Sequence, residues 1–178
     1  VPFEVMPALE KASAEDVLRL LDYPAYFDLL GRPLPENREG ILQALAADEL
    51  IERHEGGGWC IRNLGAMLFA KRLADFSTLK RKAVRVIAYR GSGRVETIRE
   101  QEGSRGYAAG FEGLIGFING LLPSNEVIGQ ALRKTVPIYP ELAIRELVAN
   151  ALIHQDFFVT GSGPMVEIFE DRMEITNP

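Results

Sequence analysis

Three polar side chains recur at four-residue intervals in the otherwise apolar stretch RELVANALIHQDF, residues 145–157. They are Glu146, Asn150 and His154. A carboxylate one helical turn before a carboxamide suits a magnesium nucleotide site. The carboxylate can hold and deprotonate a water, and the amide oxygen is a hard, neutral ligand for Mg²⁺. The spacing alone leaves two interpretations open, a binding site or a solvated helix face.

A helix that begins at Pro140 must position these residues. Proline is tolerated in a first helical turn, and Glu141 follows it where the helix dipole favours negative charge. At about 100° per residue, this helix carries two polar stripes on nearly opposite sides, one of Glu146, Asn150 and His154 and the other of Glu141, Arg145 and Gln155. A second polar stripe between apolar flanks favours a binding cleft.

Composition narrows the class of protein. A chain of 178 residues that is 47% hydrophobic can bury a core, and a net charge of -5 argues against coating nucleic acid by bulk electrostatics. The single cysteine, Cys60, excludes an internal disulfide framework and favours a reducing, cytoplasmic setting. No apolar run is long enough to cross a membrane, so we expect no membrane partner. Both ends of the sequence look cut, which predicts a piece of a longer protein.

Residues 1–62 have the order of a winged-helix-like module. Ser13 and Asp16 occupy the positions of a capping box, which predicts a helix start. Further helical stretches and two short extended pieces around Gly56 to Gly58 complete three helices and a hairpin. The third helix offers Gln43, Asp48 and Glu49 to its surroundings, which suit water better than phosphate, so a packing unit is favoured over a DNA reader.

The sequence pattern of residues 63–178 predicts an α/β (α+β) domain with helices packed on a mixed sheet. Asn63 is a candidate N-cap, and alternating patterns predict strands at 83–90, 94–100, 165–170 and 172–176. A basic group precedes or edges the first of these strands and is most simply a solvated strand start. Its members are Lys80, Arg81, Lys82 and Arg85.

The stretch IRELVANALIHQDF, followed by GSGPMVEIFEDRMEITNP, resembles the C-terminal ATPase-like segment of the divergent AAA domain family. That family is also described as RecG-related ATP-dependent DNA helicases and as predicted transcriptional regulators. NLGAMLFAKRL, KAVRVIAY and GYAAGFEGLI resemble the same family in the same order, so the resemblance covers nearly the whole chain. It implies a diverged GHKL-type ATP-binding fold, truncated here at its C-terminal end, with DNA-binding domains in flanking parts of the protein.

Carried over by position, the resemblance implies a role for each residue of the stripe. Glu146 matches the general base, Asn150 the magnesium-ligating asparagine, and His154 a position typical of the subfamily. Asn177 stands where the family places an aspartate that holds the adenine amino group. An asparagine can accept such a hydrogen bond only through its single carbonyl oxygen, without the charge of a carboxylate.

Three hypotheses follow from these residues. The first is a weak ATPase or ATP-gated switch that binds Mg-ATP. The second is a non-catalytic regulatory scaffold that links DNA-binding modules and can form a homodimer. In the third, Glu146 is satisfied by Arg145, Arg172 or a backbone donor and binds no ligand. The sequence contains no GxxxxGK[ST] loop, so we predict no helicase motor.

Overall fold

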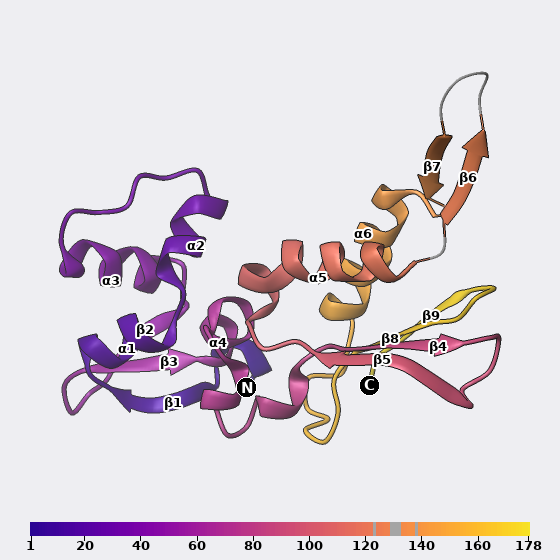
Figure 1. Ribbon diagram of the computed structural model, residues 1–178. Helices are drawn as coiled ribbons and strands as arrows, with labels where there is room; N and C mark the ends of the chain where they lie inside the picture. The colour runs from indigo at the N-terminus through magenta and orange to yellow at the C-terminus, as the bar shows by residue number, and fades with distance from the viewer. Residues whose placement is uncertain (123, 129–132, 138) are drawn as a thin grey trace. The chain divides into compact units, whose positions relative to one another are not determined.

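The computed structural model describes residues 1–122, 124–128, 133–137 and 139–178 (Figure 1). The chain has the α/β fold that the sequence predicts, and its described residues form helices, antiparallel sheets and one mixed sheet. It forms two compact units. The first contains Val1–Ala83, Ser104–Phe111 and Phe157–Ser162, and the second contains Val84–Gly103, Glu112–Asp156 and Gly163–Pro178.

The first unit contains a strand, three helices and a β-hairpin. After a 3-10 turn, η1 Phe3–Val5, the elements are β1 Pro7–Ala12, α1 Ala14–Leu20, α2 Tyr23–Leu29, α3 Arg38–Ala47, β2 Ile51–Arg53 and β3 Trp59–Arg62. The three strands form an antiparallel sheet in the order β1-β3-β2. The predicted order of three helices and a hairpin is confirmed. The sequence pattern did not reveal β1, because only Ala12 of that strand is buried.

Side-chain caps start the first two helices. The Ser13 hydroxyl accepts a hydrogen bond from the Asp16 N–H at 3.0 Å, and the Asp16 carboxylate accepts one from the Ser13 N–H at 3.0 Å. This confirms the predicted capping box, which satisfies two donors that a helix start leaves unpaired. Asp22 caps α2 through the Ala25 N–H at 3.1 Å.

The first unit continues well beyond residue 62. α4 (Asn63–Phe69) and the 3-10 turns η2 (Leu73–Asp75) and η3 (Lys80–Lys82) follow the hairpin. Residues of these elements and of the turns between them add buried side chains to the same apolar core, namely Ala66, Met67, Phe69, Leu73, Phe76 and Leu79. The boundary predicted at residue 62 therefore falls inside this unit.

Asn63 does not cap α4, because it is the first residue of that helix. Its side-chain amide instead donates a hydrogen bond to the Phe3 carbonyl at 3.0 Å, and its backbone N–H donates to Met6 at 2.8 Å. Asn63 is 4% exposed. Its amide therefore ties the N-terminal segment to the first unit instead of satisfying a helix end.

The second unit is built on a four-stranded sheet. Its strands are β4 Arg85–Arg90, β5 Glu96–Glu102, β8 Met165–Ile168 and β9 Met173–Thr176, in the order β5-β4-β8-β9. β4 pairs parallel with β8, and the two outer pairs are antiparallel. All four predicted strands are confirmed, and the sheet is mixed as expected.

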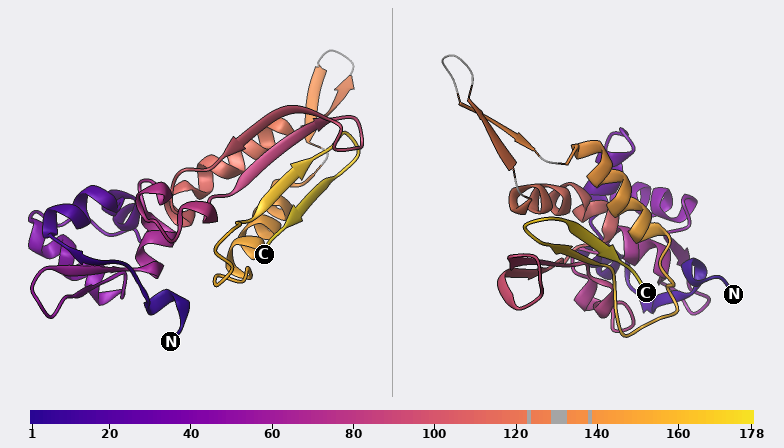
Figure 2. Two further views of the ribbon diagram at one scale, coloured as in Figure 1. Left: turned by 90° about the horizontal axis from the view of Figure 1, so that it is seen from below. Right: turned by 90° about the vertical axis from the view of Figure 1, so that its right-hand side faces the viewer.

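Two helices contribute to the second unit, α6 (Glu141–Ile153) and the part of α5 (Tyr107–Leu121) that follows Phe111. Both lie on the same face of the four-stranded sheet (Figure 2). Between them, β6 (Ser124–Ile128) and β7 (Arg133–Pro137) form an antiparallel hairpin that the sequence pattern did not reveal. Among the described residues, no helix is long and apolar enough to span a membrane.

Candidate functional site

Helix α6 carries the residues that the sequence singled out. Pro140 precedes its first turn and Glu141 lies in that turn, as predicted. Its buried side chains are Ile144, Val148 and Leu152, which recur at four-residue spacing and so form one continuous stripe. This stripe anchors α6 in the second unit and fixes which residues point away from the core.

Glu146, Asn150 and His154 lie on the face of α6 opposite to this buried stripe, and all three are exposed. Among the described residues, this polar stripe therefore faces solvent. In the described part of the chain, none of the three side chains forms a hydrogen bond or ion pair. The backbone N–H of His154 closes the helix on the Asn150 carbonyl at 2.9 Å.

The arginines that could have neutralised Glu146 are bound elsewhere. Arg145 forms two hydrogen bonds with Glu112, both of 2.7 Å, and a third with Glu141 at 3.3 Å. The hydrogen bonds from Arg145 to Glu112 lower the pKa of the Glu112 carboxyl. Arg172 binds Asp171 at 2.9 Å and the Ser92 carbonyl at 2.8 Å. The structure thus gives no support to the hypothesis that Arg145 or Arg172 satisfies Glu146.

Asn177 lies beside the same helix. Its side-chain amide donates a hydrogen bond to the Ala151 carbonyl at 3.0 Å, and the Asp156 N–H donates to Pro178 at 2.8 Å. The end of β9 is thus held against the C-terminal half of α6. Because the NH₂ of Asn177 is bound by the helix, its carbonyl oxygen is left to accept a hydrogen bond from elsewhere.

This arrangement offers oxygen ligands of the kind that Mg²⁺ prefers. The Glu146 carboxylate and the Asn150 amide oxygen are one turn apart on an exposed surface, and phosphates and waters would have to complete a magnesium shell. Among the described residues, no group of three or more His, Cys, Asp or Glu side chains could hold a metal ion by itself.

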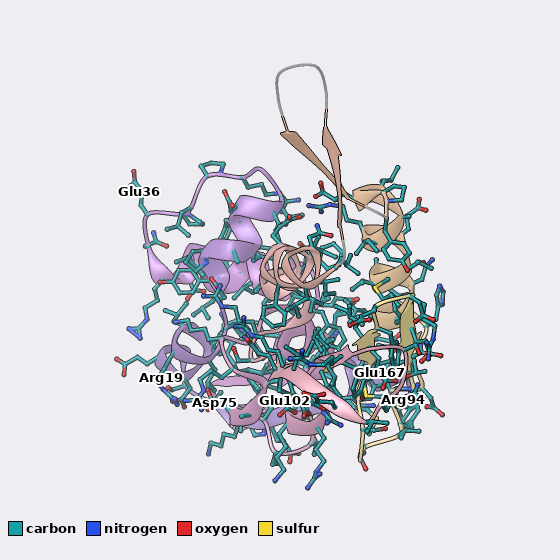
Figure 3. All side chains as sticks on the ribbon, turned by 45° about the vertical axis from the view of Figure 1, so that its right-hand side comes forward. Arg19, Glu36, Asp75, Arg94, Glu102 and Glu167 are labelled. Atoms are coloured by element: carbon teal, nitrogen blue, oxygen red, sulfur yellow. The ribbon has the colours of Figure 1, made fainter. Side chains whose placement is uncertain are left out.

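A second polar network, which the sequence analysis missed, lies on the sheet of the same unit. Glu167 of β8 is 2% exposed. Its carboxylate accepts a hydrogen bond from the Tyr89 hydroxyl at 2.7 Å, and from Arg94 Nε at 2.6 Å and Nη2 at 3.1 Å. Arg94 also binds Glu174 at 2.6 Å. Figure 3 shows Arg94 and Glu167 next to each other on this unit.

Aromatic contacts complete this network. The Phe169 ring stacks on Tyr89 with centroids 5.0 Å apart, and the guanidinium of Arg172 lies 3.9 Å from the Phe169 centroid. The Arg94 hydrogen bonds hold the pKa of the Glu167 carboxyl below its usual value, although burial opposes this. Burial, together with Glu167, raises the pKa of Tyr89. A glutamate inside the apolar run MVEIF was the sequence signal for this network.

Lys82 corrects the prediction of a solvated basic group. It is fully buried, its ammonium donates a hydrogen bond to the Val159 carbonyl, and it lies 5.8 Å from the centre of the Phe157 ring. The Tyr107 hydroxyl donates to the Lys82 carbonyl at 2.6 Å. Arg85 is exposed but ion-paired with Glu100. Lys82 therefore fastens the Phe157–Ser162 segment to the first unit.

The surface of α3 bears on nucleic-acid recognition by the first unit. Its exposed residues include Arg38, Glu39 and Gln43. Glu39 binds Arg53 of the hairpin at 3.2 Å and Gln43 at 3.3 Å, and Arg38 lies 3.6 Å from Glu15. Arg38 and Arg53 are thus each paired with a carboxylate of the same unit.

Comparison with known proteins identifies the fold. No family model matches the chain, and no curated protein matches it. The chain is similar to the crystal structure of the DIP2311 protein from Corynebacterium diphtheriae, with a TM-score of 0.59 and 21% sequence identity. The likeness covers 95% of this chain and 31% of that chain, so this chain spans about a third of that protein. At this identity the likeness shows a shared fold alone.

Proposed function

We propose that this chain is the connecting part of a DNA-binding transcriptional regulator, in which a degenerate GHKL-like domain links DNA-binding modules in flanking parts of the protein. The observation that carries this proposal is the charge of α3. In a winged helix the corresponding helix enters the major groove and needs free donors for base edges and phosphates. Here Arg38 and Arg53 are each paired with a carboxylate, and Glu39 stands between them.

The net charge of the chain supports the same conclusion. Nonspecific DNA affinity comes mainly from lysines and arginines that replace counterions on the phosphates. A chain with a net charge of -5 has little of this term to offer. The DNA contacts of the whole protein would then be made by other domains, and this chain would set their spacing and orientation.

DNA binding measured by fluorescence anisotropy tests the proposal. A longer natural protein that contains these residues should bind duplex DNA at least about tenfold more tightly than this chain at equal salt. In that longer protein, Arg38→Glu with Gln43→Glu should leave the affinity unchanged within about twofold, because α3 does not touch DNA. Equal binding by the two proteins, or a large loss in the α3 variant, would overturn the proposal.

A second candidate function is the binding of a magnesium nucleotide on α6. Two observations favour it. Glu146 and Asn150 are exposed and have no side-chain partner among the described residues, and the Asn177 carbonyl oxygen is left as an acceptor. Asn150 would supply an oxygen to Mg²⁺ and Glu146 would orient a water. Asn177 would accept from the amino group of a base, and His154 would contact phosphate.

Calorimetric titration with Mg-ATP tests this candidate. Binding should be lost in Asn150→Ala and retained in Asn119→Ala, which removes an exposed carboxamide from α5 as a matched control. Asn177→Asp should tighten binding, since a carboxylate accepts a stronger hydrogen bond than an amide. An affinity that is the same in all four proteins would exclude the α6 face as the nucleotide site.

A further inference from the structure

Helix α6 exposes large apolar side chains on its polar face. Leu142 is 69% exposed, Leu147 52% and Ile153 65%. With about 100° per residue, these three side chains and the polar stripe share an arc of about 140°. Single exposed apolar residues are ordinary, but several on one helix face together with polar groups are typical of an interaction surface.

The composition of this face is balanced about Asn150. Three residues before it stands Leu147 and three after it Ile153, both large and apolar. Four residues before it stands Glu146 and four after it His154, which are an acid and a base. When a helix packs antiparallel on a copy of itself, residues equally far from the two-fold axis lie at the same level. The face is therefore complementary to itself.

We infer that this face is a homodimer contact, in which two α6 helices pack antiparallel about a two-fold axis at Asn150. Each Glu146 then lies at the level of the partner's His154, and the imidazole N–H donates to the carboxylate twice per dimer. The two Asn150 carboxamides meet at the axis, where each can donate and accept. Leu147 and Ile153 flank these pairs and lose exposed apolar surface.

Charge selects the antiparallel arrangement. In a parallel pair, Glu146 would lie beside the partner's Glu146, and like charges at that distance repel. The antiparallel pair replaces this repulsion with two contacts between acid and base. The buried stripe of α6, Ile144, Val148 and Leu152, lies on the other side of the helix, so pairing requires no change in the core of the second unit.

The contact is a single helix pair, and it is smaller than the interface of a permanent dimer. We therefore expect a reversible dimer whose fraction rises with concentration, visible by sedimentation velocity over about a hundredfold range. The inference does not rest on the proposed connecting function. It uses the same residues as the nucleotide candidate, so dimerisation and nucleotide binding would exclude each other.

A charge exchange tests the register of the pair. Glu146→Lys alone sets a cation against the partner's His154, and His154→Glu alone sets two carboxylates against each other. Each should raise the dissociation constant at least about tenfold. The double variant exchanges the charges and should restore dimerisation to within about threefold. Glu36→Lys, a reversal at an exposed site of the first unit that Figure 3 labels, should have no effect.

Cross-linking tests the position of the axis. Helices about 8–10 Å apart, with Cα atoms about 2.3 Å from each axis, bring the two Cα atoms at position 150 within disulfide range. In a Cys60→Ser background, Asn150→Cys should form a covalent dimer when an added oxidant takes up the two thiol hydrogens. Glu141→Cys, exposed on the opposite side of α6, should not.

Three results obtained with this chain would overturn the inference. The chain could remain monomeric at every concentration, either charge reversal alone could dimerise as well as the unchanged chain, or position 150 could fail to cross-link. A longer natural protein that remains monomeric and protects α6 from hydrogen exchange would also overturn it, because another segment would then cover this face. None of these results would change the DNA measurement that tests the connecting function.

Discussion

The second unit has two groups of polar residues, one on its sheet and one on α6, and they differ in how many hydrogen bonds they make within the fold. On the sheet, Glu167 is 2% exposed and accepts hydrogen bonds from Tyr89 and Arg94. On α6, Glu146 and Asn150 are exposed, and neither side chain has a hydrogen-bonding partner among the described residues. The second unit thus contains one polar group that is hydrogen-bonded within the fold and another whose side chains make no hydrogen bond among the described residues.

The difference shows how to separate structural from functional polar residues. A buried charge is tolerated only when it is paired and hydrogen-bonded, so the partners of Glu167 account for its presence. The exposed side chains of Glu146, Asn150 and His154 have no partners among the described residues that would explain their presence. The three large apolar residues beside them are not explained by the fold either. The comparison therefore explains the first group by stability, and the binding roles proposed above would explain the second.

The largest expected effect is that of removing the buried carboxylate. Glu167→Ala should lower the free energy of unfolding by about 2–4 kcal/mol, because it leaves the Tyr89 hydroxyl without its acceptor and Arg94 without its main partner. Urea unfolding followed by circular dichroism measures this loss. Glu174→Ala is the matched control, because its carboxylate is partly exposed and its loss should cost under about 1 kcal/mol. Equal losses in the two variants would break the comparison.

A hydrogen-bonded pair in the first unit, Tyr26 and Asp48, predicts that the stability of the chain falls at alkaline pH. Burial and a hydrogen bond to Asp48 raise the pKa of Tyr26 from its usual value near 10 to about 12. Between these two values the unfolded chain loses the proton first. Stability is therefore unaffected below pH 10 and should fall by about 2 kcal/mol as the pH approaches 12.

Trp59 makes this measurement specific. It is the one tryptophan of the sequence and is buried in the first unit, so its fluorescence follows the unfolding of that unit. Tyr26→Phe removes the titrating group and should flatten the loss of stability between pH 10 and 12. If the variant and the original chain lose stability in parallel over this range, Tyr26 is not the group responsible.

A smaller effect is expected at the start of α1. Ser13→Ala removes the hydroxyl that accepts from the Asp16 N–H and should cost about 1 kcal/mol. Thermal unfolding followed by Trp59 fluorescence measures it. Ser13→Thr keeps an acceptor and should recover most of the loss. A cost near zero in Ser13→Ala would mean that water replaces this cap and that the hydroxyl does not stabilise the fold.

Local features of this fold were accessible from the sequence. Ser13 and Asp16 predicted a capping box, because a cap depends on residues three positions apart. The alternation around β4 and β8 predicted strands, because this pattern depends on neighbours in the chain. The polar stripe of α6 was found in the same way, and the structure places its three members on one exposed helix face.

Features that depend on distant pairing were not accessible. Lys82 was read as solvated because three other cations surround it in the sequence, whereas its partner Val159 lies far along the chain. Glu167 was not singled out because nothing near it in the sequence reveals Tyr89 and Arg94 as its partners. The predicted cleft stays a prediction for the same reason, since helical spacing tells which residues share a face and not what covers that face.

The smallest expected effect on stability is that of a substitution in the exposed polar stripe of α6. Asn150→Ala, measured at a protein concentration low enough to keep the chain monomeric, should leave the free energy of unfolding unchanged or raise it by up to about 0.5 kcal/mol. Alanine is the better helix former, and no hydrogen bond of the carboxamide is lost. A loss above about 1 kcal/mol would show that the fold needs this side chain after all. A neutral result, combined with weakened dimerisation or lost nucleotide binding in the same variant, would support a binding role for this face. A residue whose removal costs the monomer nothing can act only through what it contacts outside the chain.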